Sequence, residues 1–121
     1  MSKLPVMIIG SNPRNLELLS QFLGKEGYET RVATTQEQFV EILDSEERLG
    51  LALVDITGFD RSIWQHCERC SELGIPLFVI SAPQPKQSPH EGLSHGAHGV
   101  LYKPLVVKEL IQLVKTMSLE N

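Results

Sequence analysis

The sequence has little of what marks several large classes of protein. It has only two cysteines, and its first ten residues contain one lysine before a short apolar run, so they are expected to enter the fold and not to act as a secretory signal. No apolar run approaches the roughly 20 residues that a membrane-spanning helix needs. Lysine and arginine form no cluster, and 11 basic against 15 acidic residues give a formal charge of −4. We therefore predict a cytoplasmic protein with free thiols that does not bind membranes or, directly, nucleic acid.

The length and composition are those of one ordinary folded domain. The chain has 121 residues, of which 41% are hydrophobic and 21% are charged. Two domains of half this length would each approach the size at which a hydrophobic core stops supporting itself. A single domain over residues 1–121 is predicted, and a large multidomain enzyme is excluded.

Short apolar segments alternate with amphipathic segments along the chain. The apolar segments have strand length and cover residues 5–9, 28–33, 51–54, 76–80 and 99–102. Most are apolar throughout, as expected for central parallel strands, whereas residues 28–33 alternate in polarity and indicate a strand nearer the edge. Helices are predicted over residues 13–25, 36–47, 60–73, 89–96 and 106–118, the fourth being short because prolines interrupt that region.

This fivefold alternation predicts an α/β fold with one doubly wound, five-stranded parallel sheet and helices on both faces. In such folds ligands bind at the carboxyl ends of the strands. The residues at these ends are 10–12, 55–58, 81–82 and 102–104. Among them Asp55, Ser81 and Lys103 would place an acid, a hydroxyl and an amine around one shallow pocket.

The order and spacing of these motifs resemble those of response regulator receiver domains, which have a flavodoxin-like fold. The resemblance covers nearly the whole chain and rests on VMIIGSNPRNLELL, LVD, FVISA and GAHGVLYKPL. It implies that Asp55 is the phosphoacceptor position, that Ser81 hydrogen-bonds the phosphoryl oxygens, and that Lys103 pairs first with the aspartate and then with the phosphate. It also implies a cis peptide bond before Pro104, an isomer that is accessible before proline.

Several positions depart from the family pattern. Gly10 and Ser11 replace the two acidic residues that hold Mg²⁺, so Asp55 remains as the only carboxylate of that set. The loop after Asp55 looks short, which predicts that Thr57, whose backbone carbonyl would be a metal ligand, is displaced. Val100 occupies the position of the aromatic switch residue.

These departures predict a degenerate receiver that signals by protein–protein contacts, with weak or absent Mg²⁺ binding, no other cofactor, and a standing Asp55–Lys103 ion pair. The alternative is a working phosphoacceptor that takes a phosphoryl group from a histidine kinase onto Asp55 by self-catalysed transfer. No other enzymatic activity is expected. The predicted partners are a histidine kinase or another signalling protein, a second copy bound through the fourth helix, last strand and fifth helix, and an output domain outside this chain.

Two other kinds of site have weaker support in the sequence than the receiver site. The pairs Cys67/Cys70 and His95/His98 suggest a zinc site, and His66 and His90 are near in sequence. However, the spacing between the two pairs exceeds that of a usual zinc finger. Cysteines three apart in a helix are also more often core residues than ligands. The segment 10–12 has only one of the three glycines of a dinucleotide-binding motif. A flavodoxin-like module that binds a small ligand or a metal remains a third hypothesis.

Overall fold

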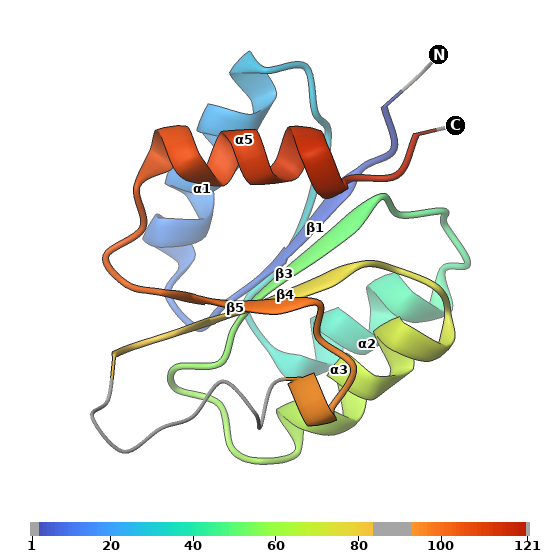
Figure 1. The fold of residues 1–121 in the computed structure, drawn as a ribbon. Coiled ribbons are helices and arrows are strands. Elements are labelled where there is room, and N and C mark those ends of the chain that lie inside the picture. Colours follow the sequence, from blue (N-terminus) through green and yellow to red (C-terminus); the bar gives the residue numbers. More distant parts are fainter. Residues whose placement is uncertain (1–2, 84–92, 121) are drawn as a thin grey trace.

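Five parallel strands form one sheet at the centre of the computed structural model, which describes residues 3–83 and 93–120 (Figure 1). The spatial order is β2-β1-β3-β4-β5, and all four pairings are parallel. The strands are β1 (Val6–Ile9), β2 (Thr30–Ala33), β3 (Leu51–Asp55), β4 (Leu77–Ser81) and β5 (Gly99–Tyr102). The doubly wound α/β fold predicted from the sequence is confirmed. Strand order reverses beside β1, so the carboxyl ends of β1 and β3 flank the point at which such folds bind ligands.

Four helices with bounds in the described residues cover the two faces of the sheet. They are α1 (Pro13–Lys25), α2 (Gln36–Asp44), α3 (Ile63–Glu72) and α5 (Val107–Met117). In Figure 1, α1 and α5 lie on one face of the sheet, and α2 and α3 lie on the other. The core is accordingly in two clusters, one on each side of the sheet.

The burial of the strands follows from the apolar pattern of the sequence. All residues of β1 and β4 are buried, as are the first four of β3, because helices cover both faces there. Strands β2 and β5 lie at the edges and are more exposed, as the alternating segment 28–33 predicted for β2.

Local capping sets where two of the helices begin. The side-chain oxygen of Asn12 accepts hydrogen bonds from the backbone N–H groups of Arg14 and Asn15, at 3.1 and 3.3 Å, and Pro13 occupies the first turn of α1. The Thr35 side chain caps α2 by accepting from Gln38 N at 3.1 Å.

The bounds of two helices were predicted wrongly. Helix α2 ends at Asp44 and not near residue 47, because Glu46 has a φ of 60° that no α-helix continues. Helix α3 begins at Ile63, since residues 60–62 form tight turns with i to i+3 bonds. Leu73, the last residue of the predicted range, is 54% exposed because the helix ends before it and Gly74 turns the chain at a φ of 77°.

The short fourth helix was predicted over residues 89–96, of which 89–92 lie outside the described residues. Its described end is helical at residues 93–94 and turns at 95–96. No helix in residues 3–83 and 93–120 is long and apolar enough to cross a membrane.

The two ends of the described chain meet at the amino edge of the sheet. Lys3 and Glu120 form an antiparallel bridge, and Leu119 N donates to the carbonyl of Gly50 at 2.9 Å. Figure 1 shows both termini on the same side of the molecule. Gly50 is required there, because a Cβ at this position would lie 2.6 Å from Ser118 Oγ and 2.8 Å from the Leu119 carbonyl oxygen.

Candidate functional site

An ion pair between Asp55 and Lys103 lies at the carboxyl end of the sheet. Asp55 is the last residue of β3, and Lys103 follows β5 directly, so two strands separated by β4 bring the side chains together. Lys103 Nζ lies 2.6 Å from Asp55 Oδ2, and the side chains are 32% and 17% exposed. At this burial the attraction is screened less than that of an ordinary surface pair. The ion pair expected from the sequence is therefore present.

Thr57 lies at this site and contacts both members of the ion pair. Its backbone N–H donates to Asp55 Oδ1 at 3.0 Å, and its hydroxyl lies 3.4 Å from Lys103 Nζ. Its carbonyl oxygen accepts a hydrogen bond of 2.9 Å from the hydroxyl of Ser11. The short loop thus folds back on Asp55, and a side chain from the end of β1 binds the carbonyl that the family resemblance had assigned to metal.

Gly58 allows this close approach between the two loops. Its φ is 88°, and a Cβ on it would lie 2.5 Å from Ser11 Oγ and 3.2 Å from Ser11 Cβ. Only glycine adopts this conformation at low cost while leaving room for the Ser11 hydroxyl.

Gly10 is packed as closely as Gly58, although its backbone is ordinary. A Cβ there would lie 3.0 Å from Leu16 Cδ2 and 3.4 Å from Asp55 Cβ. A side chain at position 10 would therefore stand directly beside Asp55, which is where the sequence comparison with the family placed an acidic residue.

The other predicted site residues are Ser81, Pro104 and Val100. Ser81 ends β4 and is 6% exposed, and its hydroxyl donates to the Ala82 carbonyl at 3.1 Å. The peptide bond between Lys103 and Pro104 is cis. Val100 is partly buried and packs against the core cluster on the side of α2 and α3.

The residues considered for zinc do not converge. Cys67 and Cys70 are fully buried in the core, and burial raises the pKa of each thiol to about 12. The His95 ring stacks on Trp64 at 4.9 Å and its Nδ1 lies 3.1 Å from Glu68, whereas His98 Nδ1 accepts from Leu77 N at 3.3 Å. Within residues 3–83 and 93–120, no three His, Cys, Asp or Glu side chains are grouped to hold a metal. His90 lies outside those residues.

One protein-family model matches most of the chain. The model of the response regulator receiver domain matches residues 6–115, which include every strand and all but the end of α5. The chain belongs to the response regulator receiver domain family. Members of this family interact with histidine kinases and with output domains, and they are generally not enzymes beyond catalysing their own phosphotransfer.

Similar proteins agree with this assignment. The chain is 25% identical over 112 residues to the "Heme response regulator HssR" of Staphylococcus saprophyticus, a match that covers 92% of this chain and 50% of that protein. The receiver domain thus spans about half the length of the curated relative that it matches.

The fold is also shared with solved structures. A CheY-like receiver domain protein from Methanospirillum hungatei has a TM-score of 0.84 at 24% identity, covering 95% of this chain and 93% of that one. A receiver domain from Francisella has a TM-score of 0.79 at 19% identity, with 94% and 95% covered. At these identities the likeness establishes the receiver fold.

Sequence reasoning missed two features of the site. It treated Ser11 only as the loss of a carboxylate, although the hydroxyl makes a new bond to Thr57. A serine replacing an acidic residue, together with a glycine in the facing loop, is the signal that could have indicated this contact. It also missed a cavity that opens between α1 and the chain after β5.

Proposed function

We propose that this receiver domain is a degenerate one, which signals by protein–protein contacts and undergoes weak or no Mg²⁺-dependent phosphorylation. The observation that carries the proposal is the hydrogen bond of 2.9 Å from Ser11 Oγ to the Thr57 carbonyl. In this arrangement a hydroxyl satisfies an oxygen that a cation would otherwise bind.

The donor chemistry supports the proposal. Mg²⁺ prefers an octahedral shell of oxygens and is held in proteins by carboxylates and waters. Position 10 has no side chain and position 11 has a neutral hydroxyl, so Asp55 brings the only negative charge of the three positions. Both of its oxygens already accept hydrogen bonds, from Thr57 N and Lys103 Nζ. These residues do not fit a magnesium site of the family's kind.

The charge balance points the same way. A cluster of carboxylates repels itself and is relieved by a cation. Here the positive charge of Lys103, 2.6 Å from Asp55, already neutralises the single carboxylate. A receiver built in this way holds one arrangement of the site without metal.

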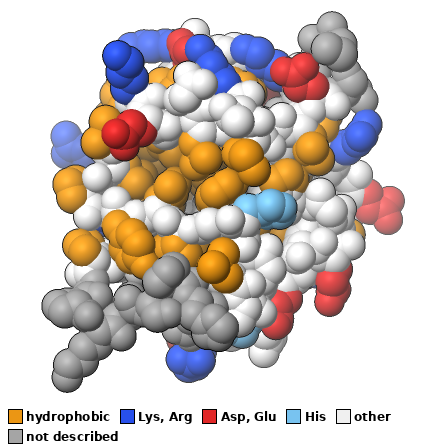
Figure 2. All heavy atoms as spheres, in the orientation of Figure 1, with side chains coloured by type: hydrophobic (Ala, Val, Ile, Leu, Met, Phe, Trp, Pro, Cys, Tyr) orange, Lys and Arg blue, Asp and Glu red, His pale blue; other side chains and the backbone are white. Residues whose placement is uncertain are grey.

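A face of β5 and α5 supports signalling through protein contacts. Tyr102 and Val106 are 40% and 54% exposed, beside a groove of about 310 Å³ that is also lined by Leu101, Leu105 and Leu113. Figure 2 shows apolar side chains gathered across the middle of the face on which β5 and α5 lie. Exposed apolar patches of this kind commonly mark interaction sites. A second copy of the chain is the proposed occupant. Analytical ultracentrifugation is expected to detect dimers of the unaltered protein and only monomers of a folded Val106→Glu variant; a monomeric unaltered protein contradicts this proposal.

The alternative function is phosphorylation of Asp55, favoured by the retention of Asp55, Ser81 and Lys103 at three successive strand ends. The two functions are separated by titrating Mg²⁺ in the presence of beryllofluoride and recording two-dimensional NMR spectra. The degenerate receiver shows no saturable shifts around Asp55 at millimolar Mg²⁺. Saturable shifts, or a phosphoryl mass gained from acetyl phosphate and absent in Asp55→Asn, overturn the proposal.

A pair of variants makes this test sharper. Gly10→Asp/Ser11→Asp restores the acidic pair, and Gly10→Asn/Ser11→Asn has nearly the same shape without the charge. A side chain at position 10 displaces the Leu16 methyl by a few tenths of an ångström in both variants, because the Cβ contact of 3.0 Å is common to them. We expect saturable Mg²⁺ binding in the aspartate variant alone. Equal Mg²⁺ binding by the unaltered protein contradicts the proposal.

A further inference from the structure

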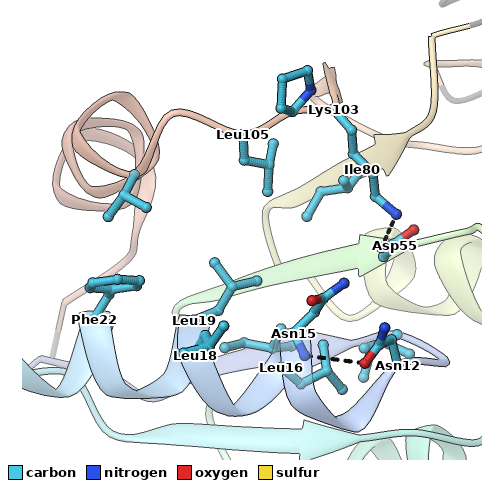
Figure 3. A pocket seen from close by; sticks show the side chains of 15 residues that line it. Asn12, Asn15, Leu16, Leu18, Leu19, Phe22, Asp55, Ile80, Lys103 and Leu105 are labelled. Carbon is cyan, nitrogen blue, oxygen red and sulfur yellow. Dashed lines mark hydrogen bonds and ion pairs between the residues drawn. The ribbon is translucent and has the colours of Figure 1, made fainter.

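A cavity of about 410 Å³ lies beside the Asp55–Lys103 pair, between α1 and the segment that leads from β5 into α5 (Figure 3). We call it the α1–α5 cavity. Its volume is within the range of about 300–1,000 Å³ that is usual for small-molecule sites. All of its lining residues belong to the described chain.

The lining of the α1–α5 cavity is divided between a polar end and an apolar body. The polar end consists of Asn12, Asn15, Asp55 and Lys103. In Figure 3 these side chains gather at one end, whereas Leu19, Leu105 and Phe22 line the space that leads away from them along α1. A site with few convergent polar groups at one end of an apolar hollow fits a ligand with a polar head and an apolar tail.

The charges at the polar end cancel. Asp55 and Lys103 lie 2.6 Å apart, and the other two polar residues are neutral amides. A carboxylate head would meet Asp55 and an ammonium head would meet Lys103, so a charged head gains attraction from one residue and repulsion from its neighbour. The polar end therefore matches an uncharged head.

Hydrogen-bonding capacity at the polar end remains unused. The Lys103 ammonium has three N–H donors, of which Asp55 and Thr57 accept two. The Asn15 side-chain amide points toward the polar end in Figure 3 and makes no hydrogen bond with another described residue. Each Asp55 oxygen retains a second lone pair. The head must thus accept from Lys103 and donate to Asp55 or to the Asn15 oxygen.

The apolar body has surface that the protein does not cover. Leu18 is 45% exposed, and Leu19, Phe22 and Leu105 are only partly buried. These side chains form a continuous apolar wall with the fully buried Ile8 and Ile80 behind them. A tail lying along this wall would remove apolar area from water, which is favourable in proportion to the area removed.

We propose that the α1–α5 cavity binds a small uncharged amphiphile, whose head both donates and accepts hydrogen bonds and whose tail is unbranched and apolar. Primary carboxamides have this head, since the carbonyl accepts from Lys103 and the N–H₂ donates to Asp55. Binding uses the resting ion pair and needs neither Mg²⁺ nor a phosphoryl group. The proposal therefore goes beyond the proposed function and stands or falls separately from it.

The test compares three heads on one tail. Octanamide, octanoate and octylamine are titrated at pH 7, without Mg²⁺ or phosphate, and followed by two-dimensional NMR of the labelled protein. We expect octanamide to give saturable shifts confined to residues at the cavity, in α1, around Asp55 and in residues 103–107, with affinity at least tenfold above those of the two charged compounds. Hexanamide is expected to bind about 15-fold more weakly than octanamide, at roughly fourfold for each methylene lost.

Two matched variants locate the site. Leu18→Ser removes apolar wall at an exposed position, so the fold is preserved and octanamide binding weakens severalfold. Leu73→Ser makes the same change at a similarly exposed leucine outside the cavity, and binding stays unchanged. The proposal is overturned if octanamide gives no saturable shift, if either charged compound binds as well, or if the two variants behave alike.

Discussion

Replacing Gly58 with alanine tests the contact on which the proposed function rests. Two effects of the alanine lower the free energy of unfolding. The first is the φ of 88°, which costs a residue with a Cβ about 1–2 kcal/mol and is partly offset by the lower entropy of the unfolded alanine chain. The second is the new Cβ, 2.5 Å from Ser11 Oγ, which forces that hydroxyl away from the Thr57 carbonyl. Losing that hydrogen bond costs about 1 kcal/mol.

Gly74→Ala is the matched control, because Gly74 has a similar φ of 77° and nothing within 4 Å of the added Cβ. We expect Gly74→Ala to lower the free energy of unfolding by about 1 kcal/mol and Gly58→Ala to lower it by about 2 kcal/mol. Urea unfolding followed by the fluorescence of Trp64, which is only 8% exposed, measures both values. The difference corresponds to a midpoint shift of roughly 0.5 M.

The hydroxyl itself is tested by repeating both substitutions in a Ser11→Ala background. Most of the extra cost of Gly58→Ala is expected to disappear there, because only the 3.2 Å contact with the Cβ of residue 11 remains, giving a coupling energy of about 1 kcal/mol between positions 11 and 58. If Gly58→Ala costs no more than Gly74→Ala with Ser11 present, then Ser11 does not occupy the space beside Gly58, and the reasoning from the closed loop is refuted.

Further predictions concern the core and the helices. Cys67 and Cys70 are expected to react with iodoacetamide far more slowly in the folded protein than in urea, because burial raises each pKa to about 12; rapid native labelling would contradict this. Unfolded thiols ionise near pH 9, so stability is expected to fall between about pH 9 and 12 by roughly 1.4 kcal/mol per unit and thiol, and the Cys67→Ala/Cys70→Ala variant should show a flatter profile. Phe39→Ala should cost about 3–5 kcal/mol in urea unfolding, since this ring is fully buried, and a cost below 1 kcal/mol would show that the site is not core. Gly24→Ala should stabilise the protein by about 0.5–1 kcal/mol, because α1 continues through this position and the added Cβ meets nothing; lower stability would refute it.

Much of the fold could be predicted because short apolar segments and amphipathic segments alternate along the chain. The runs VMII, LALV and LFVI have no polar residue, and only the centre of a parallel sheet between two helical layers offers such segments full burial. Asn12 and Pro13 likewise indicate the beginning of α1 on local grounds. These signals are read within a few residues and depend little on the rest of the molecule.

The helix ends and the geometry of the site could be predicted less well from the sequence. Helix α2 stops because Glu46 takes a positive φ, which nothing in the local sequence demands of a glutamate. The position of Thr57 depends on Ser11, which is 46 residues away in the chain and joins it only after β1 and β3 have paired. A short loop could be predicted, but the hydrogen bond that its carbonyl accepts comes from that distant hydroxyl.

The bridge between Lys3 and Glu120 means that the chain path is nearly a closed ring. A short linker could join these residues, and new termini could be opened at the exposed turn of residues 73–74, far along the chain from either. Strands β4 and β5 would then precede β1 in the permuted order, while Asp55, Lys103 and Ser11 would meet as before. The site therefore depends on how the strands lie beside one another and not on which of them is made first.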